Sequence, residues 1–227
     1  MNNYIEIKKL SKSYINEKKI SVLKNLNFKF KKGKIYSLVG PSGSGKSTLL
    51  NILSLIDRPT SGHLFIDSKK IDHNDIETND KFRSGNFGII YQEKNLLNDF
   101  TALENISLSA IANGKTQNES IKTAEKILTK LKLKKRSRHF PNELSGGENQ
   151  RIAIGRAIIN SPNIIIADEP SGNLDHKSAK EFFKLLFNLK SKKRIIIYAT
   201  HNRYFANLAD CRLQLINGKL KSINARK

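Results

Sequence analysis

The sequence has only one cysteine, Cys211, among its 227 residues. A single thiol cannot form a disulfide within the chain or supply a cysteine-cluster metal site. No apolar run approaches the roughly 20 residues that cross a bilayer, and the opening residues MNNYIEIKKL lack the basic-then-apolar pattern of a signal peptide. There is also no internal repeat and no low-complexity linker. These absences predict a cytosolic protein that carries no membrane span of its own.

Acidic residues are scarce relative to basic ones: 20 Asp and Glu face 41 Lys and Arg, which gives a net charge of +21. Such an excess fits a nucleic-acid partner, an anionic membrane surface, or a genome that favours Lys as a polar residue. Lys, Asn and Ile are all abundant, and the basic residues are scattered along the chain. The densest basic run, at 130–138, is interrupted by Leu and is typical of a helix end with a solvated face. A genome that favours Lys is therefore the preferred explanation of the positive charge, and no specific nucleic-acid partner is predicted.

Hydrophobic periodicity divides the chain into strands and helices. Strands are expected at 4–10, 26–30, 35–39, 62–67, 87–92, 164–168 and 194–200, and a final hairpin at 212–223 is expected to turn at Asn217-Gly218. Helices are expected at 46–56, 101–112, 118–133, 147–160, 177–190 and 202–209, whereas 68–86 reads as a polar loop. Strands that alternate with helices predict an α/β fold with a parallel sheet flanked by helices. We expect a single domain, 1–227, in which 93–140 is a helical insertion into a core formed by 1–92 and 141–227.

The segment from Gly40 to Thr48 reads GPSGSGKST and lies between a buried strand and a helix, the context that the pattern G-x-x-x-x-G-K-[ST] requires. Its glycines let successive backbone N–H groups turn inward around phosphates. Lys46 is expected to reach the β- and γ-oxygens, and the Ser47 hydroxyl to bind Mg²⁺. The predicted ATP-binding residues of this loop are Gly40, Pro41, Ser42, Gly43, Ser44, Gly45, Lys46, Ser47 and Thr48. The flanking strand and helix disfavour the alternative, a chance Gly/Ser-rich turn.

Polar residues with possible catalytic roles follow three other predicted strands. Asp168 and Glu169 end the run IIIADE, at the edge where parallel sheets bind ligands. Asp168 is expected to hold Mg²⁺, and Glu169 to act as general base on the attacking water. His201 could reach the γ-phosphate or orient Glu169, and Gln92 could contact Mg²⁺ or water. Each has a structural alternative: Asp168 and Glu169 could form an acidic turn that caps the next helix, His201 could be a structural histidine, and Gln92 could be an ordinary loop glutamine.

A second anion site is predicted in the stretch ELSGGENQ, residues 143–150. Ser145, Gly146, Gly147 and Glu148 stand just before the apolar run RIAIGRAII, which is typical of a helix. Backbone N–H groups at a helix N-terminus bind phosphate because the positive end of the helix dipole lies behind them. The chain therefore carries two predicted phosphate sites that are far apart in the sequence.

Taken together, these motifs resemble the ATP-binding subunits of ABC transporters over essentially the whole chain. The matching motifs are Tyr14 (adenine-stacking aromatic), Gly40–Thr48 (Walker A), Gln92 (Q-loop), Leu144–Glu148 (signature), Asp168 and Glu169 (Walker B and catalytic glutamate), Asp175 at the end of 171–175 (D-loop) and His201 (switch histidine). The resemblance implies a P-loop NTPase (RecA-like) core with an N-terminal antiparallel β subdomain and an inserted α-helical subdomain. It also implies an ATPase that uses ATP and Mg²⁺, with Ser47, Gln92 and Asp168 around the metal. The signature turn would serve ATP bound by a second copy of the chain, so a homodimer is expected in the ATP state.

Within this family, residues 91–106 (YQEKNLLNDFTALENI) and 167–175 (ADEPSGNLD) are similar to the group containing LolD, MacB and FtsE, and above all to its lipoprotein-releasing LolD members. That resemblance implies a translocase at the cytoplasmic face of the inner membrane, which drives release of outer-membrane-directed lipoproteins through separate LolC- and LolE-like permease subunits. Lipoprotein cargo would contact only those membrane subunits. An FtsE-like cell-division ATPase, the ATPase of a MacB-like exporter and a DNA- or RNA-associated ATPase are the alternatives. Asn149, Ser171 and Asn202 depart from the residues usual in the family, but none of them removes a catalytic group.

Overall fold

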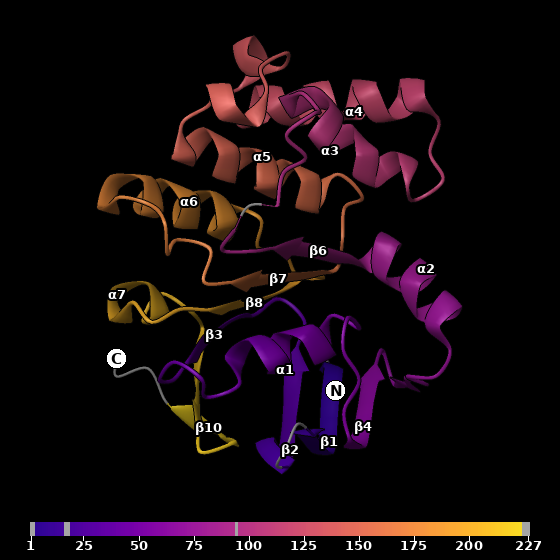
Figure 1. The fold of residues 1–227 in the computed structure, drawn as a ribbon, viewed down its shortest axis with the longest axis vertical. Helices are drawn as coiled ribbons and strands as arrows, with labels where there is room; N and C mark the ends of the chain where they lie inside the picture. Colours follow the sequence, from indigo (N-terminus) through magenta and orange to yellow (C-terminus); the bar gives the residue numbers. More distant parts are fainter. Residues whose placement is uncertain (1–2, 16–18, 94, 224–227) are drawn as a thin grey trace.

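The computed structural model describes residues 3–15, 19–93 and 95–223, which form two β-sheets and several layers of helices (Figure 1). The smaller sheet is antiparallel, with strand order β2-β1-β4-β5. Its strands are β1 (Asn3–Ile15), β2 (Lys19–Lys31), β4 (Ser61–Ile66) and β5 (Lys69–Lys70). The larger sheet has the order β10-β9-β3-β8-β7-β6 and is parallel from β9 to β6, with β10 as an antiparallel edge. Its strands are β3 (Ile35–Val39), β6 (Phe87–Ile90), β7 (Ile164–Asp168), β8 (Ile195–Ala199), β9 (Cys211–Ile216) and β10 (Lys219–Ile223).

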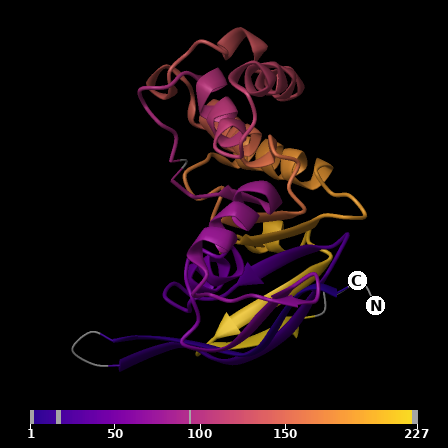
Figure 2. The same cartoon turned by 90° about the vertical axis from the view of Figure 1, so that its right-hand side faces the viewer.

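Helices cover both faces of the larger sheet. They are α1 (Lys46–Leu53), α2 (Ile76–Asn86), α3 (Ala102–Ile111), α4 (Gln117–Lys130), α5 (Gly146–Ile158), α6 (His176–Asn188) and α7 (Arg203–Ala206), with 3₁₀ turns η1 (Lys134–Arg136) and η2 (Pro141–Glu143). In Figure 1, α1 and the antiparallel sheet lie below the parallel strands, α5 and α6 lie above them, and α3 and α4 form the outermost layer. The side view keeps this order of layers (Figure 2). The predicted α/β fold with an antiparallel β subdomain is thus confirmed.

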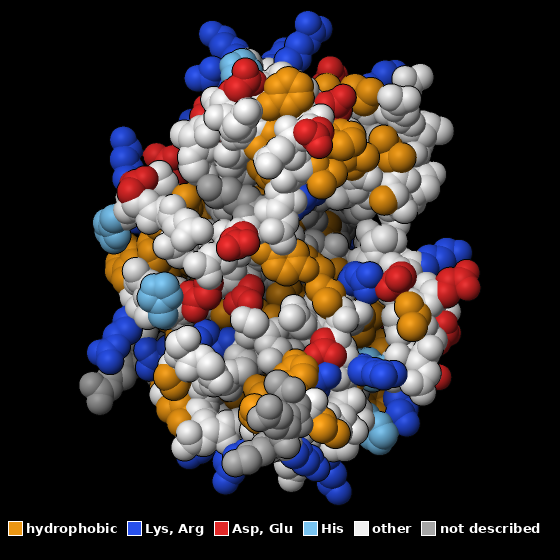
Figure 3. Space-filling view, viewed as in Figure 1, with side chains coloured by type: hydrophobic (Ala, Val, Ile, Leu, Met, Phe, Trp, Pro, Cys, Tyr) orange, Lys and Arg blue, Asp and Glu red, His pale blue; other side chains and the backbone are white. Residues whose placement is uncertain are grey.

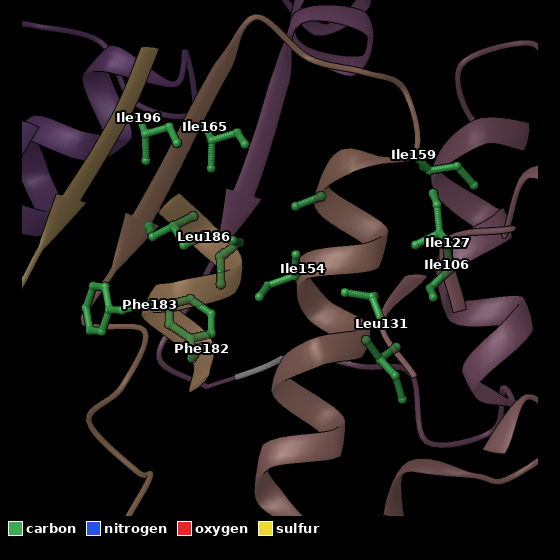
Figure 4. Close-up of a cluster of buried hydrophobic side chains, with 14 of the residues drawn as sticks. Ile106, Ile127, Leu131, Ile154, Ile159, Ile165, Phe182, Phe183, Leu186 and Ile196 are labelled. Carbon is green, nitrogen blue, oxygen red and sulfur yellow. The ribbon is translucent and has the colours of Figure 1, made fainter. Parts of the chain in front are cut away.

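The parallel strands are apolar on both faces because each face packs against a different core. In β7, Ile164 and Ile166 belong to the core shared with α1 and the antiparallel sheet, whereas Ile165 and Ala167 belong to the core shared with α5 and α6. This alternation follows from the period of two along a strand. Figure 4 shows the second core, which passes from Ile165 and Ile196 on the sheet to Phe182, Phe183 and Leu186 on α6, Ile154 on α5, and Ile106, Ile127 and Leu131 beyond it.

The prediction of a polar loop at 68–86 is wrong: this segment contains β5 and helix α2. No residue of α2 is buried, so the apolar periodicity that identifies a helix is missing from its sequence. The local signals of this helix are its ends: the Asp75 side chain caps it by accepting a hydrogen bond from Thr78 N at 3.1 Å, Glu77 lies in its first turn and Arg83 in its last. Strands β1 and β2 also extend beyond the predicted 4–10 and 26–30, and α7 is shorter than the predicted 202–209.

The other predicted elements are found close to their expected positions. The closing hairpin turns at Asn217 (φ 51°) and Gly218 (φ 74°), two left-handed residues in succession, as a tight hairpin with an Asn-Gly turn requires. Between β6 and β7, the part of the chain that the structure describes forms helices and no strand. The boundaries 93–140 of the helical insertion stay a prediction, and residue 94 within them lies outside the described residues.

Helix α3 begins at a capping box, and its loss should destabilise the protein measurably. Thr101 Oγ1 accepts a hydrogen bond from Glu104 N at 3.3 Å, while Thr101 N donates to Glu104 Oε2 at 2.8 Å. We expect Thr101→Ala to lower the free energy of unfolding by about 1 kcal/mol, measured by urea denaturation. Thr129→Ala is the control, because the Thr129 hydroxyl bonds only to the carbonyl of Glu125 in its own helix. Equal denaturation midpoints for the two variants would contradict this prediction.

Basic side chains do not gather into one patch on the face drawn in space-filling form. Lys and Arg project from the upper, lower and lateral margins of that face (Figure 3). This scatter agrees with the spread of basic residues along the sequence. None of the described helices is both long and apolar enough to cross a lipid bilayer.

Candidate active site

Four strands of the larger sheet bring the predicted site residues to one edge. Gly40 follows β3, Gln92 follows β6, Glu169 follows β7 and His201 follows β8, and these strands are parallel neighbours in the order β3-β8-β7-β6. Their carboxyl ends therefore lie side by side, where ligands bind in open α/β sheets. A cavity of about 510 Å³ lies at this edge. It is lined by Val22, Gly40, Ser42, Gly43, Gly45, Lys46, Ser47, Thr48, Gln92, Glu169 and His201.

The turn between β3 and α1 requires glycine at two positions. Gly43 has φ 72° and Gly45 has φ 98°, a region that residues with a side chain rarely adopt. A Cβ on Gly45 would also lie 2.6 Å from Val22 Cγ1. Gly45 is the N-cap of α1 and has no side chain that could accept hydrogen bonds from the first backbone N–H groups of the helix. The first helical residues, 46–48, line the cavity, so their N–H groups are available to an anion.

The Lys46 ammonium is held by this turn, and the residue as a whole is only 9% exposed. Its Nζ donates to the carbonyl oxygens of Gly40, at 3.0 Å, and Pro41, at 3.2 Å. A third neighbour is Glu169 Oε1, at 3.8 Å. Burial of an ammonium is costly without such partners. The ammonium therefore lies next to the proposed phosphate position. Phosphate oxygens could replace the two neutral carbonyl oxygens as its hydrogen-bond acceptors.

Asp168 and Ser47 meet behind the cavity and fit a divalent cation. The even-numbered residues of β7 face α1, so Asp168 points toward the first turn of that helix. Burial raises the pKa of the Asp168 carboxyl above its ordinary value, and a hydrogen bond from the Ser47 hydroxyl opposes this rise. Asp168 Oδ1 is buried and has no hydrogen-bond partner. An unpartnered carboxylate oxygen beside a hydroxyl matches the oxygen ligands that Mg²⁺ prefers.

Glu169 leaves the strand in a left-handed conformation, with φ 43°. Its backbone N donates to Ala199 O at 3.2 Å, and its carbonyl accepts from Gly172 N at 3.0 Å. Its Oε2 accepts from His201 N at 3.2 Å and lies 2.9 Å from His201 Nδ1. A carboxylate can only accept, so Nδ1 is the protonated nitrogen in this contact. The carboxylate is therefore fixed between His201 and the Lys46 ammonium.

Gln92 lines the cavity from the loop after β6. Its side chain packs closely on the backbone of Gly172, where an added Cβ would lie 2.8 Å from Gln92 Nε2. The glutamine is thus in contact with the segment that follows Glu169. This position is compatible with a ligand of a cation in the cavity or with a water contact.

Tyr14 does not line the cavity. It lies on β1 with 43% of its surface exposed, its hydroxyl donates to Asp57 Oδ2 at 2.9 Å, and Lys12 Nζ lies 4.8 Å from its ring centroid. One face of the ring is therefore beside an ammonium. The stacking of Tyr14 on adenine stays a prediction.

The signature turn also lies outside the cavity, and its polar groups bond to one another. Ser145 is the N-cap of α5: its Oγ accepts from Glu148 N at 3.2 Å, and its N donates to Glu148 Oε2 at 2.8 Å. Ser145 and Gly146 are exposed, and Arg136 pairs with Glu148 at 3.1 Å. This helix N-terminus is accessible from outside the chain and is separate from the Lys46 cavity.

Asp175 caps α6 close to the signature turn. Its Oδ1 accepts from Lys177 N at 2.9 Å and from Ser178 N at 3.0 Å. A Cβ on Gly147 would lie 3.3 Å from Ser178 Oγ, so the N-termini of α5 and α6 are neighbours. The pKa of the Asp175 carboxyl is lowered by its hydrogen bonds with Ser178.

Two residues near the site were not predicted from the sequence. Val22 on β2 lines the cavity, but nothing in its local sequence indicates contact with a loop that follows another strand. Gln150 is buried, and its Nε2 donates to Pro170 O at 2.8 Å. Its neighbours Asn149 and Arg151 are also polar, so the local sequence contains no signal for the burial of Gln150.

Known proteins resemble this chain over nearly its full length. The sequence profile of the ABC transporter family matches residues 23–172. The chain is 42% identical to the lipoprotein-releasing system ATP-binding protein LolD of Rickettsia bellii, a match covering 96% of this chain and 98% of that protein. It is 43% identical to LolD of Wigglesworthia glossinidia brevipalpis, over 99% of this chain and 100% of that protein. It is also 40% identical to the macrolide export ATP-binding/permease protein MacB of Bartonella henselae, over 92% of this chain but only 32% of MacB.

Among solved structures, the dimeric post-hydrolysis state of the ATP-binding cassette MJ0796 bound to ADP and Pi superimposes with a TM-score of 0.89. The two sequences are 36% identical, and the match covers 98% of this chain and 99% of that one. The profile match, the full-length relatives and the shared fold agree with one another. The chain therefore belongs to the ABC transporter family.

Proposed function

We propose that this chain is the ATP-hydrolysing subunit of an ABC transporter and that ATP binds in the cavity beside Lys46. One observation carries the proposal: the Glu169 carboxylate is fixed between Lys46 and His201 in a cavity of about 510 Å³ at the end of the glycine-rich turn. Support also comes from the ADP and Pi bound to the MJ0796 cassette, which has the same fold. The phosphate-binding residues would be those of the turn Gly40–Thr48, with Tyr14 beside the base.

In this proposal the first residue to respond to ATP is Lys46. Its ammonium exchanges the carbonyls of Gly40 and Pro41 for β- and γ-phosphate oxygens, since charged acceptors make stronger hydrogen bonds than neutral ones. The N–H groups at the start of α1 bind the same phosphates. Lys46 then lies between the γ-phosphate and Glu169, and it limits the repulsion between those two negative groups.

Glu169 acts as the general base. Its Oε2 is already engaged by His201, so Oε1 is the oxygen that accepts a proton from the water attacking the γ-phosphate. The contacts of His201 with the carboxylate favour a role in orienting Glu169 over direct binding of the γ-phosphate by His201. Transferring a phosphoryl group depends mainly on positioning and electrostatic stabilisation, and these residues supply both.

Ser47, Asp168 and Gln92 are proposed to hold Mg²⁺ with the nucleotide. The unpartnered Oδ1 of Asp168 and its contact with the Ser47 hydroxyl support this assignment. When bound, the cation would neutralise negative charge on the β- and γ-phosphates. Burial of the Asp168 Oδ1 atom limits competition from bulk water at that oxygen.

The signature turn is proposed to serve ATP held by a second copy of the chain. Ser145, Gly146 and Gly147 lie at an accessible helix N-terminus away from this chain's own cavity. In a head-to-tail dimer, this turn would close over the γ-phosphate bound by the partner's Lys46. The dimeric MJ0796 cassettes support such an assembly. Hydrolysis would remove the phosphate that bridges the two copies.

The transport reaction proposed is the release of outer-membrane-directed lipoproteins from the inner membrane. Support comes from the LolD relatives, which are part of lipoprotein-releasing systems by name and match this chain over 96–99% of its length. The membrane-spanning part would be supplied by separate LolC- and LolE-like permease subunits, with this chain bound peripherally at their cytoplasmic face. Cargo would contact the permease subunits alone. A MacB-like export function is the second candidate, because MacB proteins match at similar identity but carry this ATPase as about one third of a longer chain.

Affinity purification from detergent-solubilised native membranes tests the transport proposal. We expect the tagged chain to co-purify with two different multi-span membrane proteins, and lipoproteins to co-purify only when those subunits are present. The Lys46→Ala variant is a useful control, because assembly with permease subunits should not need bound nucleotide. Recovery of a single exporter-type permease would favour the MacB-like function, and recovery of cell-division proteins would refute lipoprotein release.

A further inference from the structure

Gln150 forms a buried bridge between the signature helix and the segment that carries Glu169. It lies in the second turn of α5, with only 1% of its surface exposed. Its Nε2 donates a hydrogen bond to the carbonyl oxygen of Pro170 at 2.8 Å. Pro170 follows Glu169 directly in the sequence, so the bridge joins a signature-bearing helix to the backbone next to the proposed catalytic base.

Stability alone does not explain a glutamine at this position. The Oε1 atom of Gln150 is buried and has no hydrogen-bond partner. Leaving a buried acceptor unpaired costs about 1–3 kcal/mol, whereas one hydrogen bond contributes about 0.5–1.5 kcal/mol. An apolar side chain of the same length would remove this unpaired acceptor, but it would leave the buried Pro170 carbonyl without its donor, at a similar cost. The glutamine therefore gives the fold little net stability, and its effect is on the position of the backbone at Pro170.

The backbone around Glu169 needs support from its surroundings. Glu169 has φ 43°, a conformation that is unfavourable for a residue with a side chain and persists only where neighbours fix it. Its N–H is held by Ala199 O on the β8 side. On the C-terminal side of Glu169, the next residue, Pro170, is held by the hydrogen bond that its carbonyl oxygen accepts from Gln150 on α5. Gln150 thus holds the backbone beside Glu169 from the α5 side, while His201 and Lys46 contact the carboxylate itself.

We propose that Gln150 is a positioning residue that couples the signature turn to the catalytic carboxylate of Glu169. The proposal rests on the proposed function, because it requires the Ser145 turn to receive a nucleotide from a partner. Gln150 lies four residues after Gly146 on the same face of one rigid helix. A shift of the signature turn on binding the partner's γ-phosphate therefore moves the Gln150 amide, and the Pro170 carbonyl follows. Each chain aligns its own base when its signature turn is occupied.

The variant Gln150→Met tests this coupling in the full chain. It keeps the length of the side chain and removes the donor and the unpaired acceptor. We expect kcat for ATP hydrolysis to fall by about 10- to 100-fold, since a misplacement of about 1 Å costs that much. The Kd for ATP should not rise, and the melting temperature should stay close to that of the wild type, because the variant removes one unpaired buried acceptor, Gln150 Oε1, while it leaves another, the Pro170 carbonyl. A structural role alone would lower stability and would not separate kcat from binding in this way.

A double variant locates the effect. In the Glu169→Gln background the base is already lost, so adding Gln150→Met should not lower the residual rate further. The double variant should still form a dimer in ATP, because the Ser145 turn is unchanged. Loss of that dimer would mean that Gln150 supports the signature turn itself and would overturn the proposal. A further rate loss of the full 10- to 100-fold in the double variant would overturn it too.

Asn160→Leu is the matched control. Asn160 follows the far end of α5, its Nδ2 donates to the carbonyl oxygens of Ser84 at 3.1 Å and Ser109 at 2.8 Å, and its Oδ1 is likewise buried without a hydrogen-bond partner. Its kcat should stay within about threefold of wild type, because these contacts are outside both the signature turn and the Glu169 turn. Wild-type kcat in Gln150→Met would refute the coupling and leave the ATPase intact. An inactive wild type would instead refute the proposed function.

Discussion

Replacing Glu169 by Gln should lower kcat for ATP hydrolysis by about 10²–10⁴-fold while nucleotide binding is retained. Glutamine has nearly the same shape, so the contact with His201 N at 3.2 Å can be kept by the amide oxygen. The amide nitrogen then occupies the position of Oε1 and has no lone pair to accept a proton from water. Phosphate release is the quantity to measure, at saturating ATP.

The same variant should accumulate as a dimer in ATP. If ATP joins two copies and hydrolysis separates them, then a chain that binds without hydrolysing remains in the joined state. Size-exclusion chromatography with and without ATP measures this change. Glu181→Gln is a matched control, because Glu181 is exposed and pairs with Arg151 at 3.5 Å away from the cavity. A monomer in ATP would contradict the shared site, and wild-type kcat would remove Glu169 from the role of base.

The parts of this fold that were predictable from sequence are those whose signal is local. Strands β7 and β8 each begin with three consecutive isoleucines, because both of their faces are buried, and their bounds were close to those expected. The turn Gly40–Thr48 was predictable because its glycines and lysine must be consecutive to surround a phosphate. The turn at Asn217-Gly218 was predictable because a left-handed pair favours these residues.

Features that depend on distant residues were not predictable in the same way. Helix α2 buries none of its residues and so has no apolar stripe. The contact between Glu169 and His201, 32 positions apart, was expected only as one of two alternatives for His201. The hydrogen bond between Lys12 and Asp57 that accompanies Tyr14 joins residues 45 positions apart and was not expected. Motif order predicted the candidate residues of the site, and the sheet order β3-β8-β7-β6 shows which of them lie at the same edge.

Lys46→Ala should weaken ATP binding by about 100-fold or more. Hydrogen bonds to charged groups contribute about 1.5–3 kcal/mol each, and the ammonium is placed to donate to phosphate oxygens in addition to balancing their charge. Part of this binding free energy is offset, because Lys46 loses its hydrogen bonds to Gly40 O and Pro41 O when phosphate binds. The Glu169 carboxylate would also face the γ-phosphate without the cation that now separates them. Isothermal titration calorimetry with ATP measures the change.

Lys190→Ala provides the matched control for loss of a lysine near the same strand. Lys190 Nζ pairs with Asp210 at 2.7 Å, and Asp210 Oδ2 accepts from Ile35 N at the amino end of β3. This variant removes the same charge from the opposite end of the strand that leads to Gly40, so its ATP affinity should match the wild type. The melting temperatures of both variants separate loss of binding from loss of folding. Unchanged ATP affinity in folded Lys46→Ala would exclude the ammonium from the nucleotide site, because no other described lysine lines the cavity and could replace it.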